Sequence, residues 1–178
     1  MTRFRKLRLA FAAGAAGSML SVNVWADDLA CKPVRDAMLT LTGVKYDARI
    51  VTTMPGSKPI VGEVIYTLDA TYQLLLGRWV KTTTSPQRQL EGERKLGATF
   101  TNCVRVGNEA VNAEPAAVYT AHTENRTLVP FTGTLKLWVS RKRGLPLRTE
   151  ADSSVLLLGK SHTIKLYSYG NIRPPAGP

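Results

Sequence analysis

His122 and Glu124 come nearest to an acid–base pair in this sequence. They stand two positions apart in an alternating segment, so a strand would place both side chains on one face. A histidine beside a carboxylate can carry protons near neutral pH. No serine or cysteine nucleophile accompanies the pair at a readable spacing, and His162, near Lys160, is expected to be solvated. We therefore interpret His122 and Glu124 as a surface pair, and a secreted hydrolase built on them is the least favoured hypothesis.

Metal and cofactor sites have no better support. The chain has two histidines and two cysteines, too few ligands for a zinc site of the usual type, and no HExxH spacing. The glycine-rich phosphate loops and the GxSxG elbow of hydrolases are also missing. The sequence therefore predicts a non-enzymatic protein with no catalytic residue, no metal ion and no cofactor.

The first 26 residues have the order of a secretory signal peptide. A basic head without an acidic residue precedes an apolar run at 9–20, and the segment ends in Val24-Trp25-Ala26, with small or branched side chains before the cut. The run of about twelve residues is shorter than the ~20 that a membrane span needs. We predict a signal peptide at 1–26, cleavage after Ala26, a periplasmic single domain at 27–178 and no transmembrane segment after cleavage.

Cys31 and Cys103 are the only cysteines, and both lie beyond the predicted cleavage site. An exported protein meets an oxidising compartment, and an even number of cysteines favours a disulfide there. The bond would close a loop of about 70 residues, which the chain-entropy model values at roughly 4 kcal/mol. The spacing is unlike CxxC, so a catalytic redox role is disfavoured.

The charge balance narrows the choice of partner. The chain carries 24 Lys+Arg against 13 Asp+Glu, a net charge of +11. An exported basic domain rarely meets nucleic acid, so anionic lipid head groups or acidic envelope partners are the expected counter-charges. Arg141-Lys142-Arg143 is the only dense basic run, and we interpret it as a solvated hairpin turn before Gly144.

One segment has the pattern of a helix. From Asp28 to Leu41 the apolar residues recur at helical spacing, and Gly43 is expected to stop the helix. Pro33 is tolerated in a first turn and damaging later, so the helix is predicted to begin near Lys32.

Period-two alternation dominates the rest of the chain and predicts short antiparallel strands. Thr82 to Leu96 lacks this alternation and is predicted to be a loop or short helix, a candidate lid. About eight strands behind one amphipathic helix favour a curved sheet whose concave face receives the helix. The expected strands are 44–50, 60–68, 72–81, 98–106, 116–124, 134–141, 145–153 and 161–169.

Several segments carry a family resemblance. In the C-terminal half, a strand that contains Trp138 turns at Gly144-Leu145-Pro146, and Tyr169-Gly170-Asn171-Ile172 ends the sheet. The upstream segments are Asn102-Cys103-Val104, Val106–Val111 and Ala116–Tyr119. Together they resemble the exported half-barrel proteins of the lipoprotein-carrier (LolA-like) superfamily over roughly Leu29 to Pro175. This chain departs from the carrier in its single clear helix and its short length, which leaves Ser85–Leu96 and the N-terminal helix as a reduced lid.

The resemblance implies an α+β, mainly antiparallel fold: a strongly curved, half-open β-barrel of about eight strands with the N-terminal helix on its concave face. It also implies binding of lipids or acyl chains without covalent chemistry. An acyl chain gains about 0.8 kcal/mol per buried CH₂, so apolar area alone can hold it. We predict that large apolar side chains line the cavity, with Trp79 and Trp138 at its mouth; the others are Ile50, Val64, Tyr66, Leu76, Tyr119, Leu135, Leu137, Leu147, Ile164 and Leu166.

The leading hypothesis is a periplasmic binding protein, a carrier or sensor, that holds a lipid or other hydrophobic ligand. The alternative is a module with a filled core and no ligand that contacts envelope or membrane-associated proteins. The identity of the ligand, the choice between transport and sensing, and the oligomeric state stay open at this point.

Overall fold

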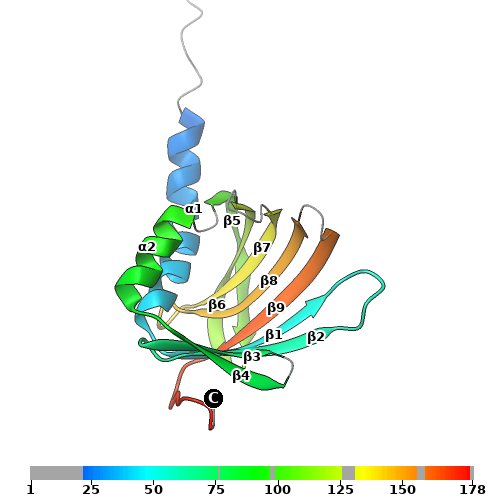
Figure 1. The fold of residues 1–178 in the computed structure, drawn as a ribbon. Coiled ribbons are helices and arrows are strands. Elements are labelled where there is room, and N and C mark those ends of the chain that lie inside the picture. The colour runs from blue at the N-terminus through cyan, green and yellow to red at the C-terminus, as the bar shows by residue number, and fades with distance from the viewer. Residues whose placement is uncertain (1–21, 76, 97–98, 126–130, 156–158, 177–178) are drawn as a thin grey trace, which may run out of the picture.

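The computed structural model describes residues 22–75, 77–96, 99–125, 131–155 and 159–176. Nine strands within these residues form one antiparallel sheet, in the order β4-β3-β2-β1-β9-β8-β7-β6-β5. The sheet curls strongly but β4 does not pair with β5, so the predicted half-open barrel is confirmed (Figure 1). The strands are β1 Tyr46–Thr53, β2 Ile60–Tyr66, β3 Ala70–Leu75, β4 Arg78–Thr83, β5 Thr99–Val111, β6 Glu114–Asn125, β7 Phe131–Ser140, β8 Pro146–Val155 and β9 Gly159–Ser168.

Two series of hairpins build this sheet. Strands β1 to β4 follow one another in space, strands β5 to β9 do the same, and β9 pairs with β1 to join the series. The chain passes from β4 to β5 through α2 (Pro86–Leu96), so this helix leads from one free edge of the sheet to the other. The Arg88 amide donates to Ser85 Oγ at 3.3 Å, which makes Ser85 the helix cap.

The N-terminal helix α1 (Val22–Thr40) begins earlier than the position near Lys32 that the sequence favoured. Pro33 therefore lies inside the helix, where it removes one backbone hydrogen bond. Cys31 and Val34 on either side of it are fully buried, and packing of this kind overrides local propensity. The helix passes into the 3-10 turn η1 (Leu41–Gly43), close to the end that Gly43 predicted.

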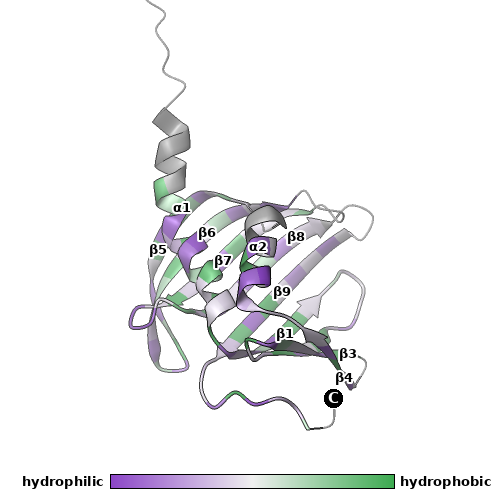
Figure 2. Cartoon of the chain, turned by 60° about the vertical axis from the view of Figure 1, so that its left-hand side comes forward, coloured by the Kyte–Doolittle hydropathy of each residue, from purple (hydrophilic) through white to green (hydrophobic). Residues whose placement is uncertain are grey.

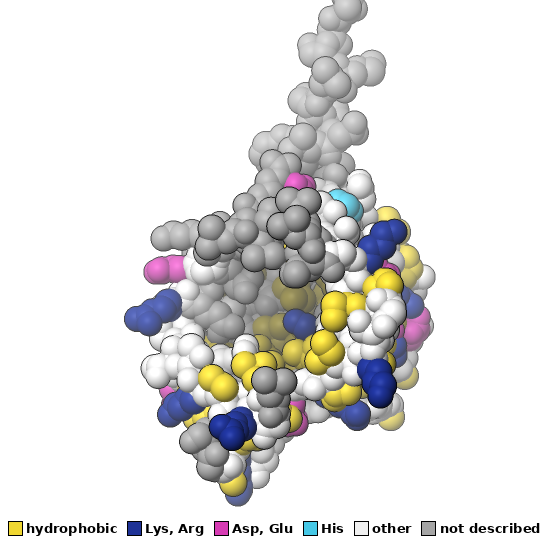
Figure 3. Space-filling model, turned by 45° about the vertical axis from the view of Figure 1, so that its right-hand side comes forward, with side chains coloured by type: hydrophobic (Ala, Val, Ile, Leu, Met, Phe, Trp, Pro, Cys, Tyr) yellow, Lys and Arg dark blue, Asp and Glu magenta, His cyan; other side chains and the backbone are white. Residues whose placement is uncertain are grey.

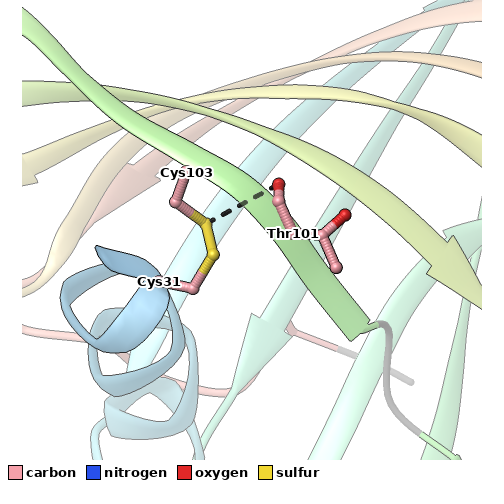
Figure 4. The surroundings of a disulfide bond; sticks show 3 residues. All are labelled: Cys31, Thr101 and Cys103. Carbon is pink, nitrogen blue, oxygen red and sulfur yellow. Dashed lines mark hydrogen bonds between the residues drawn. A yellow bond between two sulfur atoms is a disulfide. The ribbon is translucent and has the colours of Figure 1, made fainter. Parts of the chain in front are cut away.

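Helix α1 lies on the concave side of the sheet, as expected (Figure 2). Cys31 on the helix and Cys103 on β5 form the predicted disulfide, with Cα atoms 5.0 Å apart (Figure 4). Around this bond the helix packs against β5, β6 and β7 in the largest buried cluster of the described residues, which contains Cys31, Val34, Ala37, Cys103, Ala121, Leu135, Leu137 and Val139.

The segment from Tyr72 to Lys81 is a hairpin and not the single strand that was predicted. Strands β3 and β4 pair in register from Ala70 with Thr83 to Leu75 with Arg78. Gly77 at the turn has φ of 78°, a conformation that glycine adopts without strain. An apolar run on both sides of this glycine concealed the turn, which explains why the sheet has nine strands and not about eight.

The convex side of the sheet has apolar clusters of its own. Trp138 packs there with Ala116, Val118 and Leu147. A second convex-side cluster lies on β2 to β4, where Ile172 of the C-terminal segment packs against Ile65, Ala70, Tyr72 and Trp79. Among the described residues, no helix is both long and apolar enough to cross a membrane.

Candidate functional site: the inner face of the half-barrel

Strand register divides the sheet into two faces. Leu137 of β7 packs in the cluster under α1, and we call its side of the sheet the inner face. Leu137 stands opposite Tyr119 on β6 and opposite Thr149 on β8. Thr149 is opposite Lys165 on β9, which is opposite Ile50 on β1. Because cross-strand partners share a face, the inner face continues from β6 to β1.

One half of this inner face is filled by the protein itself. Over β5, β6 and β7 the side chains of α1 cover the sheet, and Leu135 and Leu137 are 8% and 0% exposed. The disulfide fixes α1 to this half. The filled half is therefore a protein core and offers no ligand site between α1 and these strands.

A cluster of tyrosines closes one end of the remaining half. The Tyr66 hydroxyl donates to the Thr42 carbonyl oxygen of η1 at 3.0 Å, and Tyr66 is fully buried. The Tyr46 ring lies 5.4 Å from that of Tyr66 and 5.8 Å from that of Tyr167. Burial raises the pKa of Tyr167 to about 12 and also raises the pKa of Tyr66. These hydroxyls therefore stay protonated and neutral at physiological pH.

The opposite end of the same half is uncovered. Ile60 on β2, Leu75 on β3 and Val80 on β4 belong to the inner face by register, and they are 56%, 52% and 46% exposed. Ile50 and Val64, further along the strands, are half-buried. Seen from the side of the β1–β2 and β3–β4 turns, the molecule is hollowed, with hydrophobic side chains in the hollow and around it (Figure 3).

The exposure along β2 gives the hollow its direction. On the inner face of this strand, exposure falls from 56% at Ile60 to 0% at Tyr66, with half-buried positions between. The hollow is therefore blind at the η1 end and opens at the end where the β1–β2 and β3–β4 hairpins turn. An extended apolar molecule could enter along the strands and stop at the tyrosines.

A polar stripe follows β8 and β9 beside this apolar surface. Thr52 Oγ1 and Thr163 Oγ1 lie 3.1 Å apart, and Ser153 Oγ and Ser161 Oγ lie 3.0 Å apart. All four side chains are on the inner face by register, as is that of Lys165. Because the four hydroxyls bond in pairs, they can face an apolar molecule at little desolvation cost and still offer hydrogen bonds to a polar group.

The structure divides the predicted cavity residues between the two faces. The inner face holds Ile50, Val64, Tyr66, Tyr119, Leu135 and Leu137. Of these, Leu135 and Leu137 belong to the filled half, and Ile50 and Val64 border the hollow. Leu76 lies outside the described residues.

The other predicted lining residues lie on the outer face: Trp79, Trp138, Leu147, Ile164 and Leu166. The reason is strand alternation, because Ile164 and Leu166 flank the inner Lys165 and point the other way. Leu147 follows a register shift between Trp138 and Val139, which moves it to the outer cluster. Ile50 and Val64 therefore remain candidate lining residues of the hollow, and Ile60, Leu75 and Val80, which the sequence did not single out, lie beside them on the inner face.

Trp138 belongs to a charged cluster on the outer face and does not lie at the mouth of a cavity, where the sequence placed it. Its Nε1 donates to Glu109 Oε2 at 2.7 Å, and Lys136 Nζ and Arg148 Cζ lie 4.5 and 4.9 Å from its ring centroid. The bonds from Trp138 and Lys136 hold the pKa of Glu109 below its ordinary value. Cross-strand pairing brings these residues together, a signal that alternation alone does not contain.

The candidate acid–base residues also lie on the outer face. His122 and Glu124 share it, as predicted, and stand opposite Thr134 and Thr132 on β7. His162, expected to be solvated, is half-exposed and bonds through Nδ1 to Asp152 Oδ1 at 2.8 Å. These histidines border a shallow pocket of about 550 Å³ whose other lining residues are Thr53, Pro55, Thr132, Gly133, Thr134, Asp152, Ser153, Ser154, Lys160 and Ser161. Within the described part of the chain, no three potential metal ligands converge.

Comparison with known proteins finds similarity in fold only. No family model and no curated protein matches the sequence. The structure is similar to LprF from Mycobacterium bovis at 13% identity, covering 84% of this chain and 98% of LprF, with a TM-score of 0.46. It is similar to the Pseudomonas aeruginosa MucA/MucB complex at 14% identity, covering 83% of this chain and 59% of that chain, with a TM-score of 0.45. A LolA superfamily protein from Nitrosomonas europaea is similar at 9% identity, covering 74% of this chain and 86% of its own, with a TM-score of 0.23.

Proposed function

We propose that this protein is a non-enzymatic binding protein of the periplasm that holds a hydrophobic ligand, a lipid or acyl chain, in the hollow of the half-barrel. The observation that carries the proposal is the group of exposed apolar side chains on the uncovered half of the inner face. Ile60, Leu75 and Val80 each leave about half of the side chain in contact with water. Covering them with an apolar ligand is worth about 1 kcal/mol each, because half of each side chain is already buried.

The shape of the hollow favours a molecule with a long apolar part. Its apolar side chains follow the strands from the open end toward Tyr66, and each further buried CH₂ of a chain adds about 0.8 kcal/mol. The hydroxyl pairs Thr52–Thr163 and Ser153–Ser161 run beside this surface. An amphiphile with one polar group therefore fits this arrangement better than a pure hydrocarbon.

The N-terminal residues support the proposed compartment. The basic head, the apolar run and the small residues before Asp27 favour export, and the Cys31–Cys103 bond suits an oxidising compartment. Carrier and sensor are both compatible with a periplasmic protein that binds a lipid.

The first experiment is native mass spectrometry of the exported protein, followed by organic extraction of any bound molecule. We expect a co-purifying lipid, or binding of added fatty acid or phospholipid to the ligand-free protein. A ligand-free mass together with no binding of either class would remove the proposal. The module that contacts envelope proteins through a filled core would then take its place.

A substitution at the open end of the hollow tests where the ligand binds. Leu75→Glu places a charge on the inner face, and Val104→Glu places the same charge on a similarly exposed outer residue of β5, the two being 52% and 55% exposed. We expect Leu75→Glu to weaken binding of a dansyl-labelled fatty acid about tenfold or more, because a carboxylate would lie against the chain. Equal binding by both variants would place the ligand elsewhere.

A further inference from the structure

The two hairpins at the mouth of the hollow carry exposed aliphatic side chains. The β1–β2 hairpin presents Ile60 and Val61, which are 56% and 57% exposed, and the β3–β4 hairpin presents Leu75 and Val80. Four of the eight large hydrophobic side chains that the described residues expose therefore lie on these two hairpins. We call residues 54–61, 74–75 and 77–81 the mouth edge. Strands β2 and β3 are neighbours, so both turns lie at the same end of the sheet.

The charges of the mouth edge are of one sign. It contains Lys58, Arg78 and Lys81, all exposed, and no aspartate or glutamate. Lys81 Nζ lies 5.7 Å from the centroid of the Tyr72 ring, which keeps the ammonium beside an apolar side chain. Aliphatic side chains among cations are the composition of segments that bind the surface of an anionic bilayer.

The directions of the side chains distinguish a lipid surface from a protein partner. Ile60 and Val61 are consecutive in β2, so they point to opposite faces of the sheet, yet more than half of each is exposed. A rigid protein surface that covers one face of the hairpin leaves the other face in water. A fluid head-group region receives the hairpin end-on and covers both faces together.

We infer that the mouth edge docks on an anionic lipid bilayer and brings the opening of the hollow to the membrane surface. One part of this inference rests on the proposed function: the opening faces a membrane because a lipid ligand enters or leaves there. The docking itself depends only on exposed side chains of the two hairpins. Vesicle binding and ligand binding are therefore separate measurements.

The test compares two double variants in vesicle flotation. Lys58→Glu with Val61→Glu alters the mouth edge but spares the inner face, because Val61 stands opposite Val51 on the outer face. Lys142→Glu with Val104→Glu makes the same changes elsewhere, on the β7–β8 turn and on β5. Both pairs change the net charge equally and replace similarly exposed valines, at 57% and 55%. The exported protein is used, with its N-terminus checked by intact mass.

We expect the wild type to float with vesicles of equal parts phosphatidylglycerol and phosphatidylcholine. The mouth-edge variant should lose about tenfold or more in vesicle affinity, because a lysine near such a surface contributes about 1 kcal/mol and its reversal also adds repulsion. The control variant should stay within about threefold of the wild type, since neither of its two positions belongs to the mouth edge. Both variants should bind the dansyl-labelled fatty acid as the wild type does.

Three results overturn the inference: a wild type that does not float, equal losses in both double variants, or unchanged flotation of the mouth-edge variant. A wild type that binds fatty acid but not vesicles refutes this inference alone. One that floats but binds no lipid ligand refutes the proposed function alone. As a second measurement, Val61→Trp should show a blue-shifted emission in difference spectra against the wild type on these vesicles, and no shift would contradict insertion.

Discussion

Glu114, the first residue of β6, directs its carboxylate to the β7–β8 turn, where it bonds to three side-chain groups. Arg143 donates to it from Nε at 3.0 Å and from Nη2 at 2.5 Å, and Ser140 Oγ is a third partner. The Arg143 bond, and after it the Ser140 bond, lower the pKa of Glu114 from its ordinary value. The basic run Arg141-Lys142-Arg143, interpreted from the sequence as a solvated turn, is therefore held in part by the bonds of Arg143 to Glu114.

Replacing Glu114 by glutamine should lower the melting temperature at neutral pH by about 2–4 °C, as expected for about 1 kcal/mol from a two-pronged charged bond that is partly exposed. The folded carboxyl has the lower pKa, so its contribution is complete above the ordinary glutamate pKa and disappears as the pH falls through the folded value. Thermal melts from pH 7 to pH 3 should show the two proteins converging. Glu91→Gln, at an exposed position of α2, is the control, and a difference that does not shrink as the pH falls would contradict the assignment.

Among the elements, β7 and β8 approach each other at Gly133 so closely that no side-chain carbon fits there. A Cβ at this position would lie 2.0 Å from the Asp152 carbonyl oxygen, which is backbone and cannot move aside cheaply. We expect Gly133→Ala to destabilise the protein by about 2 kcal/mol or more in urea unfolding. Gly92→Ala in α2 meets nothing within 4 Å and should stabilise it by about 0.5–1 kcal/mol. Two variants of equal stability would mean that the strands do not approach as described.

The disulfide joins two elements, and its loss should act on both. In Cys31→Ser, helix α1 is no longer tied to β5, and the chain-entropy model gives a loss of about 4 kcal/mol, or roughly 10 °C in melting temperature. The comparison is differential scanning calorimetry of the variant and of oxidised and reduced wild type. Reductant should leave the double variant Cys31→Ser, Cys103→Ser unchanged. If oxidised and reduced wild type melt together, the bond does not stabilise the fold.

The elements that the sequence predicted well are those with one apolar and one polar face. Strand β1 has Ala48 and Ile50 on the inner face and the exposed Arg49 between them, as alternation predicted. Strand β7 is covered on both sides, by α1 over Leu137 and by charged side chains over Trp138. Its sequence therefore does not say which face is inner, and Trp138 was placed on the wrong one.

The start of α1 and the β3–β4 turn were hidden for different reasons. Pro33 suggests a helix start, but burial of Cys31 and Val34 in the core keeps the helix continuous across it. Gly77 interrupts a run that is apolar on both sides, so period and composition do not change at the turn. The mouth residues Ile60 and Leu75 were missed because exposure at a strand end depends on the curvature of the whole sheet.

At the scale of the whole molecule, the half-barrel divides into a filled half under α1 and a hollow half over β1 to β4. The exposed apolar side chains Ile60, Leu75 and Val80 of the inner face all lie in the hollow half, so a ligand that covers them should stabilise the folded state without changing the disulfide or the filled core. A ligand at about 100 times its dissociation constant adds about 2.7 kcal/mol. We expect saturating fatty acid to raise the melting temperature of the wild type by roughly 5–10 °C and that of Leu75→Glu far less. Equal shifts would contradict binding in the hollow.

Because β4 and β5 remain unpaired, the width of the hollow is not dictated by strand number and shear, as it is in a closed barrel. The sheet can change its curvature while every ladder bond is kept. Among the described elements, two covalent links limit the separation of its free edges: α2, which leads from β4 to β5, and the Cys31–Cys103 bond, which joins β5 to the helix that precedes β1. A hollow of variable width distinguishes ligands by the apolar area that they bury and not by their exact shape. We therefore expect chains of different length and degree of unsaturation to bind with similar affinity per methylene, so that selectivity resides in the polar end of the ligand.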